Sequence, residues 1–219
     1  MRQGHLKQPW RFFPVVIVAS GPSLTLEQCE LVRQRRDDDA IRVIVINDCY
    51  QRVPNADLLF AMDGPWWRLH LSTIETTCPA MPRMTCDAQA KKQGAEFVHA
   101  MPGRGVAPAE AAWIRRGSSS GFAAVGIAIK RGAQHIVLVG FDAKRSKDGK
   151  SHWFGDHPKD KLPAPQPFTT WAEEYDSLAQ PCQELGIRIV NSSLDSATRK
   201  LPRASLEEEI WTPTLSKAA

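Results

Sequence analysis

The sequence predicts an α/β fold built on a doubly wound, mostly parallel β-sheet. Short apolar runs without polar alternation recur along the chain, which is typical of strands covered on both faces, and helix-like segments separate them. Most of these runs stop at glycine, serine, asparagine or aspartate, and ligands bind beside such strand ends in parallel sheets. We therefore expect a single Rossmann-like domain over residues 1–219, with peripheral tails at 1–13 and 205–219.

The first expected strand is the apolar run Val15–Val18, which leads into a turn of small residues that begins at Ser20. Gly21 has no Cβ and would let a ligand approach the backbone closely. Pro22 and Ser23 suit the start of a helix, whose free N–H groups attract phosphate. The turn is therefore predicted to cradle a phosphate, and an ordinary tight turn between a strand and a helix is the alternative.

The other main strands are apolar runs, which we expect at 41–46, 57–62, 135–139 and 187–190. Asn47, Asp63 and Asp142 follow the first three of these runs, on the side where ligands bind. The small-residue segment 119–132 predicts a helix closed by a glycine. Residues 64–118 show weak periodicity, with one further strand expected near 96–99, and they indicate no chemistry.

Composition narrows the class of protein. The chain has a formal net charge of +4 and a pI near 8.9, which suits an anionic small ligand at least as well as nucleic acid. Five cysteines without a CxxC pair argue against a disulfide scaffold or a zinc ribbon. There is no 18-residue apolar run, and residues 1–13 do not resemble a signal sequence. We expect a cytoplasmic protein with reduced cysteines and no membrane span, and the sequence indicates no oligomeric state.

Residues 143–170 form a Pro- and Lys-rich stretch that we expect to be a lid loop over the site. Its cations should repel one another until an anion binds, and its imidazoles could accept a proton. The residues concerned are Lys144, Arg145, Lys147, Lys150, His152 and His157. A metal site made by the two histidines with Asp156 lacks further ligands in the sequence, so we predict none. A solvated loop and a nucleic-acid patch are the alternatives.

The order of these segments resembles bacterial sialyltransferases of the Campylobacter lipooligosaccharide type and the related DUF115 group. That group includes flagellin-modifying glycosyltransferases and archaeal 6-hydroxymethylpterin diphosphokinases, and small proteins of Mu-like phages look similar. The resemblance covers most of residues 14–157. Its motifs are GPSL at 21–24, Asn47, DGP at 63–65, the segment from SSSGF to LVGFD at 118–142, and SHWFGDH at 151–157.

The resemblance implies a role for each matching residue. Those that would bind the nucleotide or donor are Ser20, Gly21, Pro22, Ser23, Asn47, Asp63, Ser119, Ser120, Gly121 and Asp142. His157 matches the general base, although Asp156 is an extra residue before it, and His152 is the alternative base. The family's two tyrosines after the GFD segment are absent, so Lys144, Arg145 or Lys147 would stabilise the leaving phosphate instead.

The expected function is therefore metal-independent glycosyl transfer from a nucleotide sugar, CMP-type among the candidates, to an unknown acceptor. No tightly bound cofactor is expected. One alternative is a diphosphokinase with Mg²⁺ held by Asp63 or Asp142. The other is a phage-encoded nucleotide-binding protein without catalysis.

Overall fold

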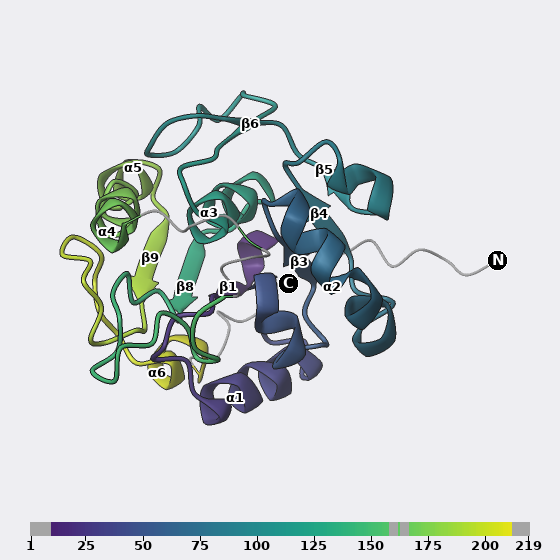
Figure 1. Ribbon diagram of the computed structural model, residues 1–219. Coiled ribbons are helices and arrows are strands. Elements are labelled where there is room, and N and C mark those ends of the chain that lie inside the picture. Colours follow the sequence, from purple (N-terminus) through teal and green to yellow (C-terminus); the bar gives the residue numbers. More distant parts are fainter. Residues whose placement is uncertain (1–9, 158–161, 163–166, 212–219) are drawn as a thin grey trace.

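The computed structural model describes residues 10–157, 162 and 167–211, and it is built on a seven-stranded, wholly parallel sheet (Figure 1). Across the sheet the strand order is β5-β4-β3-β2-β1-β8-β9. The strands are β1 (Pro14–Val18), β2 (Arg42–Ile46), β3 (Leu58–Phe60), β4 (Arg83–Thr85), β5 (Glu96–Phe97), β8 (His135–Val139) and β9 (Arg188–Asn191). A separate parallel pair joins β6 (Ala100–Met101) to β7 (Ile114–Arg115).

Helices cover both faces of the sheet, which is why the central strands are apolar throughout. The last four residues of β1 and of β8 are fully buried, and alternate residues contribute to two separate cores. One core receives α3 (Ser120–Lys130), α4 (Phe168–Asp176) and α5 (Ala179–Glu184). The other receives α1 (Leu26–Asp37), α2 (Gly64–Thr77) and α6 (Leu206–Trp211).

The sheet reverses its winding beside β1. From β1 the chain moves outward in one direction through β2 to β5, and it then returns to add β8 and β9 on the other side. Val16 therefore pairs with Val43 in β2 and with Val137 in β8. At such a switch point the loops after neighbouring strands diverge and leave a crevice at the carboxyl ends. Short 3₁₀ helices complete the fold at η1 (Trp10–Phe12), η2 (Asn47–Gln51) and η3 (Ala90–Gln93).

The predicted α/β fold with a Rossmann-like parallel sheet is confirmed, and so are the long strands and the helix at 119–132. The strand expected at 57–62 is shorter, and β5 occupies the first half of the segment expected at 96–99. The 64–118 region contains a long helix, α2, which weak periodicity concealed. Helix α4 begins inside the segment 143–170, which was expected to be loop throughout.

The described parts of both predicted tails pack on the domain. Trp10 is buried under the Arg131 guanidinium, and Leu206 and Ile210 of α6 are buried against the sheet. The outer tail segments, 1–9 and 212–219, lie outside the described residues, as do 158–161 and 163–166 of the expected lid. All five cysteines are free thiols, as expected. None of the helices in the described ranges is long and apolar enough to cross a bilayer.

Candidate functional site

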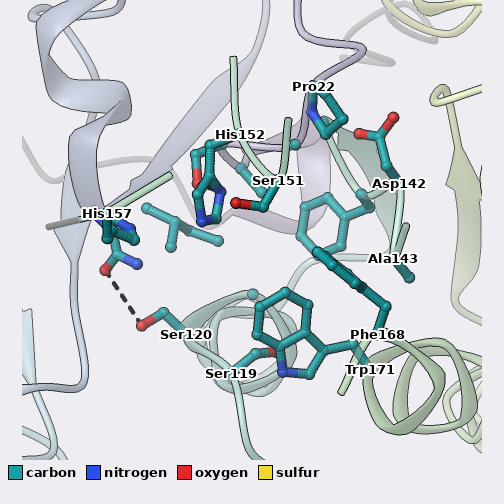
Figure 2. A pocket seen from close by; sticks show the side chains of 18 of the residues that line it. Pro22, Ser119, Ser120, Asp142, Ala143, Ser151, His152, His157, Phe168 and Trp171 are labelled. Atoms are coloured by element: carbon teal, nitrogen blue, oxygen red, sulfur yellow. Dashed lines mark hydrogen bonds between the residues drawn. The ribbon is translucent and has the colours of Figure 1, made fainter. Parts of the chain in front are cut away.

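A pocket of about 300 Å³ opens at the carboxyl ends of β1, β2, β3 and β8, where the winding reverses. Its size is at the lower end of the range for small-molecule sites. Figure 2 shows His152 and His157 along one side, Phe168 and Trp171 on the other, and the start of α3 between them. The pocket therefore has an imidazole end and an aromatic end.

The turn after β1 packs against the turn after β8, which gives its small residues a structural reason beside the predicted phosphate cradle. A Cβ on Gly21 would lie 2.0 Å from Asp142 Oδ2 and 2.3 Å from the Gly140 carbonyl oxygen. Gly140 has the same restriction, since its Cβ would lie 2.1 Å from the Ala19 carbonyl oxygen. The Gly21 amide donates to the Gly140 carbonyl over 2.9 Å. Glycine at both positions therefore permits contact between two backbones.

Ser23 does not line the pocket, and the helix expected to start at Pro22 and Ser23 does not begin there. The Ser23 amide and hydroxyl donate to the two carboxylate oxygens of Asp142 over 3.2 and 2.9 Å. Helix α1 starts at Leu26, with Thr25 as its N-cap. Burial raises the pKa of the Asp142 carboxyl, and the bonds from Ser23 oppose that rise. The part of this turn that does line the pocket is residues 19–22.

The N-terminus of α3 forms the floor of the pocket (Figure 2). Ser119 caps the helix, and its hydroxyl lies 3.1 Å from the Tyr175 hydroxyl. Ser120 Oγ donates to Asn47 Oδ1 over 3.3 Å, which fixes the loop after β2 to the helix start. The amides of Ser120 and Gly121 have no acceptor among the residues that the structure describes. Free amides at a helix start attract negative charge.

His152 and His157 face each other at the imidazole end, with ring centroids 4.7 Å apart. The Ser20 hydroxyl lies 3.1 Å from His152 Nδ1, and the His152 ring stacks on Phe154 at 5.0 Å. Burial lowers the pKa of His152 to about 4, and the neighbouring His157 adds to this. His152 is therefore a neutral imidazole in a fixed orientation near pH 7. The His157 ring has no hydrogen bond within the described residues.

Asp63 lies at the start of α2 and lines the pocket, but it does not cap the helix. The bond to the Gly64 amide comes instead from Asp87 Oδ2, over 3.1 Å. No hydrogen bond to the Asp63 carboxylate is present in the part of the chain that the structure describes. Partial burial in the wall and the Asp87 charge raise the pKa of Asp63, whereas Arg116 and His157 lower it. Asp63 is thus an uncommitted carboxylate whose charge acts favourably on a protonated His157.

Three of the four cations in the loop after β8 have carboxylate partners, and Lys147 has no ion pair within the described residues. These ion pairs join Lys144 to Asp195 at 2.6 Å, Arg145 to Asp156 at 3.0 Å, and Lys150 to Asp148 at 2.7 Å. Lys144 lines the pocket, whereas Arg145 does not. Arg145 is thus paired with a carboxylate outside the pocket lining, and its contact with a bound phosphate stays a prediction.

Helices α2 and α4 supply walls of the pocket that were not predicted from the sequence. Trp66 of α2 lines the pocket, and so do Phe168, Trp171 and Tyr175 of α4. The three residues of α4 recur at i, i+3 and i+7, which is the spacing of one helix face and is a signal that could have found them. The polar, Pro-rich sequence before α4 concealed that spacing.

No protein-family model, no curated protein and no solved structure matches this chain. The fold and the pocket therefore define the class: a parallel α/β protein with a candidate ligand site at the switch point of its sheet.

Proposed function

We propose that this protein is a transferase that binds a nucleotide-activated donor in the switch-point pocket, and that it transfers a glycosyl group with His157 as general base. The observation that carries the proposal is the arrangement of one pocket: free helix amides on the floor and paired imidazoles beside them. The amides would hold a phosphate, and an imidazole would take the proton of an acceptor hydroxyl. The resemblance to sialyltransferases and to the DUF115 group supports the same chemistry.

The charge of the pocket favours a donor with a single phosphate. Lys144 is the one lysine or arginine that lines the pocket among the described residues, and it already pairs with Asp195. Asp63 and Asp142 add two carboxylates to the lining. One helix N-terminus and one shared cation would balance the single charge of a phosphodiester, as in a CMP-type donor. A diphosphate would bring further charge close to these carboxylates.

The side chains of the pocket do not fit the alternative of a Mg²⁺-dependent diphosphokinase. Both oxygens of Asp142 accept hydrogen bonds from Ser23. Asp63 alone is uncommitted, and no group of three histidine, cysteine, aspartate or glutamate side chains within the described ranges is placed to hold a metal. Mg²⁺ prefers several oxygen ligands in octahedral geometry. We therefore propose no metal-dependent step.

Of the two imidazoles, His157 is the better base. The low pKa of His152, about 4, makes it a weak proton acceptor at neutral pH, and Ser20 occupies its Nδ1. His157 lines the pocket, and the Asp63 carboxylate is placed to stabilise the imidazolium that forms when it takes a proton. His152 would then act as a neutral wall that keeps the His157 ring in place.

A ligand panel tests the proposal. CMP, CMP-sialate, UDP, GDP and ATP are added separately, with and without Mg²⁺, and the melting temperature is measured, because a ligand that binds the native state alone raises it. We expect a CMP-type ligand to raise it without Mg²⁺. No shift with any nucleotide would refute the proposal, and a shift that requires Mg²⁺ would favour pyrophosphoryl transfer.

Turnover is measured as release of nucleotide from the stabilising donor. His157→Ala should lower it by roughly 10² to 10⁴, with donor affinity little changed, as expected for a lost general base. His152→Ala is the matched comparison. If His152→Ala shows this loss and His157→Ala does not, the assignment of the base is wrong. Binding without turnover in the wild-type protein would support a nucleotide-binding protein that lacks catalysis.

A further inference from the structure

A buried polar network lies directly behind the imidazole end of the pocket. Asp48, in η2 after β2, is 6% exposed, and its Oδ2 accepts a hydrogen bond from Trp66 Nε1 over 3.0 Å. Its Oδ1 lies 3.5 Å from His70 Nε2. The Tyr50 hydroxyl lies 3.1 Å from His70 Nδ1, and the His70 and Trp66 rings stack with centroids 4.5 Å apart. Trp66 is the member of this network that lines the pocket.

Asp48 is a buried carboxylate without a lysine or arginine partner among the described residues. Its one ion-pair contact is His70, whose pKa is lowered by burial and by the charge of His157, while Asp48 itself opposes that shift. A buried charge without a charged partner is costly, so such a group calls for an explanation beyond packing. The network thus holds a buried carboxylate that has one imidazole, and no lysine or arginine, beside it within the described residues.

The charge of Asp48 also reaches the pocket. The Asp48 carboxylate raises the pKa of His152, and so does the Asp156 carboxylate. The stronger effects of burial and of His157 lower that pKa. A positive charge on His157 acts unfavourably on both His70 and His152. The three imidazoles therefore form a coupled group: His70, His152 and His157. Two carboxylates favour a proton on this group, Asp48 behind it and Asp63 at the pocket wall.

We propose that Asp48 is a positioning residue of the site: its buried carboxylate fixes the Trp66 indole in the pocket wall and balances a proton when the pocket imidazoles take one up. This role rests on the proposed function, because transfer from an acceptor hydroxyl delivers that proton to His157. Asp48 does not line the pocket and would not touch the ligand.

Asp48→Asn separates charge from shape, since an amide oxygen can still accept the bond from Trp66 Nε1. Side-chain ¹⁵N resonances of the histidines are followed by NMR against pH in the ligand-free protein. We expect the titration midpoints of His70 and His152 to fall, that of His70 by at least about 0.5 pH unit, because a nearby negative charge favours the protonated ring. Unchanged midpoints in Asp48→Asn would overturn the proposal.

Two matched variants distinguish this role from a purely structural one. Tyr50→Phe removes the hydroxyl at His70 Nδ1 but keeps the Asp48 charge, so the midpoint of His152 should stay where it is in the wild type. Asp48→Ala removes charge and acceptor together, and it should make the Trp66 indole proton exchange faster with solvent, whereas Asp48→Asn should not. A shifted His152 midpoint in Tyr50→Phe would argue that packing, and not charge, sets the titration.

One further measurement uses the wild-type protein, so its result does not depend on whether a variant folds. If Asp48 is the partner of Nε2 and the Tyr50 hydroxyl donates to Nδ1, neutral His70 carries its proton on Nε2, which its ¹⁵N shifts report directly. The Nδ1-protonated form would overturn the proposal. These measurements use no nucleotide and so test Asp48 separately from the proposed function. If Asp48→Asn shifts the histidine titrations but the wild-type protein binds no donor, the role of Asp48 stands and the proposed function alone is refuted.

Discussion

Acidification should destabilise this protein through His152, by an amount that the structure allows to be worked out. The pKa of His152 falls from an ordinary 6.5 to about 4 in the folded chain, mainly through burial. Between these two pH values the unfolded chain binds a proton at this position and the folded chain does not. The free energy of unfolding therefore falls as the pH falls through this window.

The size of the effect follows from the pKa difference. Each pKa unit corresponds to about 1.4 kcal/mol, so the full shift is worth about 3 kcal/mol, and about 2 kcal/mol of it is lost between pH 7 and pH 5. For a domain of this length, that loss lowers the melting temperature by about 4 to 8 °C. Burial also lowers the pKa of His70 and His135, which act in the same direction.

A variant isolates the contribution of His152. His152→Asn cannot take up a proton, but its amide can still bond the Ser20 hydroxyl. Urea unfolding at pH 7, 6 and 5 should show a pH dependence that is weaker by about 2 kcal/mol in this variant than in the wild type. Equal slopes in His152→Asn and in the wild type would show that His152 is not a buried neutral imidazole.

Three further predictions concern the frame of the site. Gly21→Ala should cost about 3 kcal/mol or more in urea unfolding, because its Cβ meets backbone, whereas Gly94→Ala, with open space at φ +83°, should cost about 1 kcal/mol; similar losses would contradict the contact between the two turns. Thr25→Ala should cost about 1 kcal/mol through loss of the α1 capping box, and an unchanged urea midpoint would argue against the cap. Lys144→Met should change stability by less than about 0.5 kcal/mol, because its ion pair is exposed, but should weaken binding of the stabilising nucleotide about tenfold in a thermal-shift titration; unchanged affinity would remove Lys144 from the phosphate site.

The sequence was most informative where one physical signal dominates. Uninterrupted apolar runs such as Val15–Val18 have to be covered on both faces, so the parallel sheet could be predicted from them alone. The helix at 119–132 was recognisable by its run of small residues and its closing glycine. Because the carboxyl ends of parallel strands meet at one edge, the gathering of Asn47, Asp63 and Asp142 around one pocket also follows from their positions after strands.

What the sequence did not reveal depends on contacts between distant segments. Nothing near Ser23 indicates that its polar groups bind Asp142, 119 positions away. Local spacing likewise cannot show that Asp87 takes over the capping of α2 and leaves Asp63 free. The ion pair of Arg145 could have been predicted, because Asp156 lies close to it in the chain. The prediction counted the positive charges of the loop and left out the carboxylates among them.

The close backbone contact between Gly21 and Gly140 limits how this pocket can change. Neither residue tolerates a side chain, so the two turns after β1 and β8 cannot be altered at these positions one substitution at a time. Phe168 and Trp171 of α4 line the aromatic end of the pocket and take no part in that backbone contact. Variation in ligand preference among descendants of this chain should therefore accumulate in α4 and in the loop that precedes it, and engineering of the pocket is best started there.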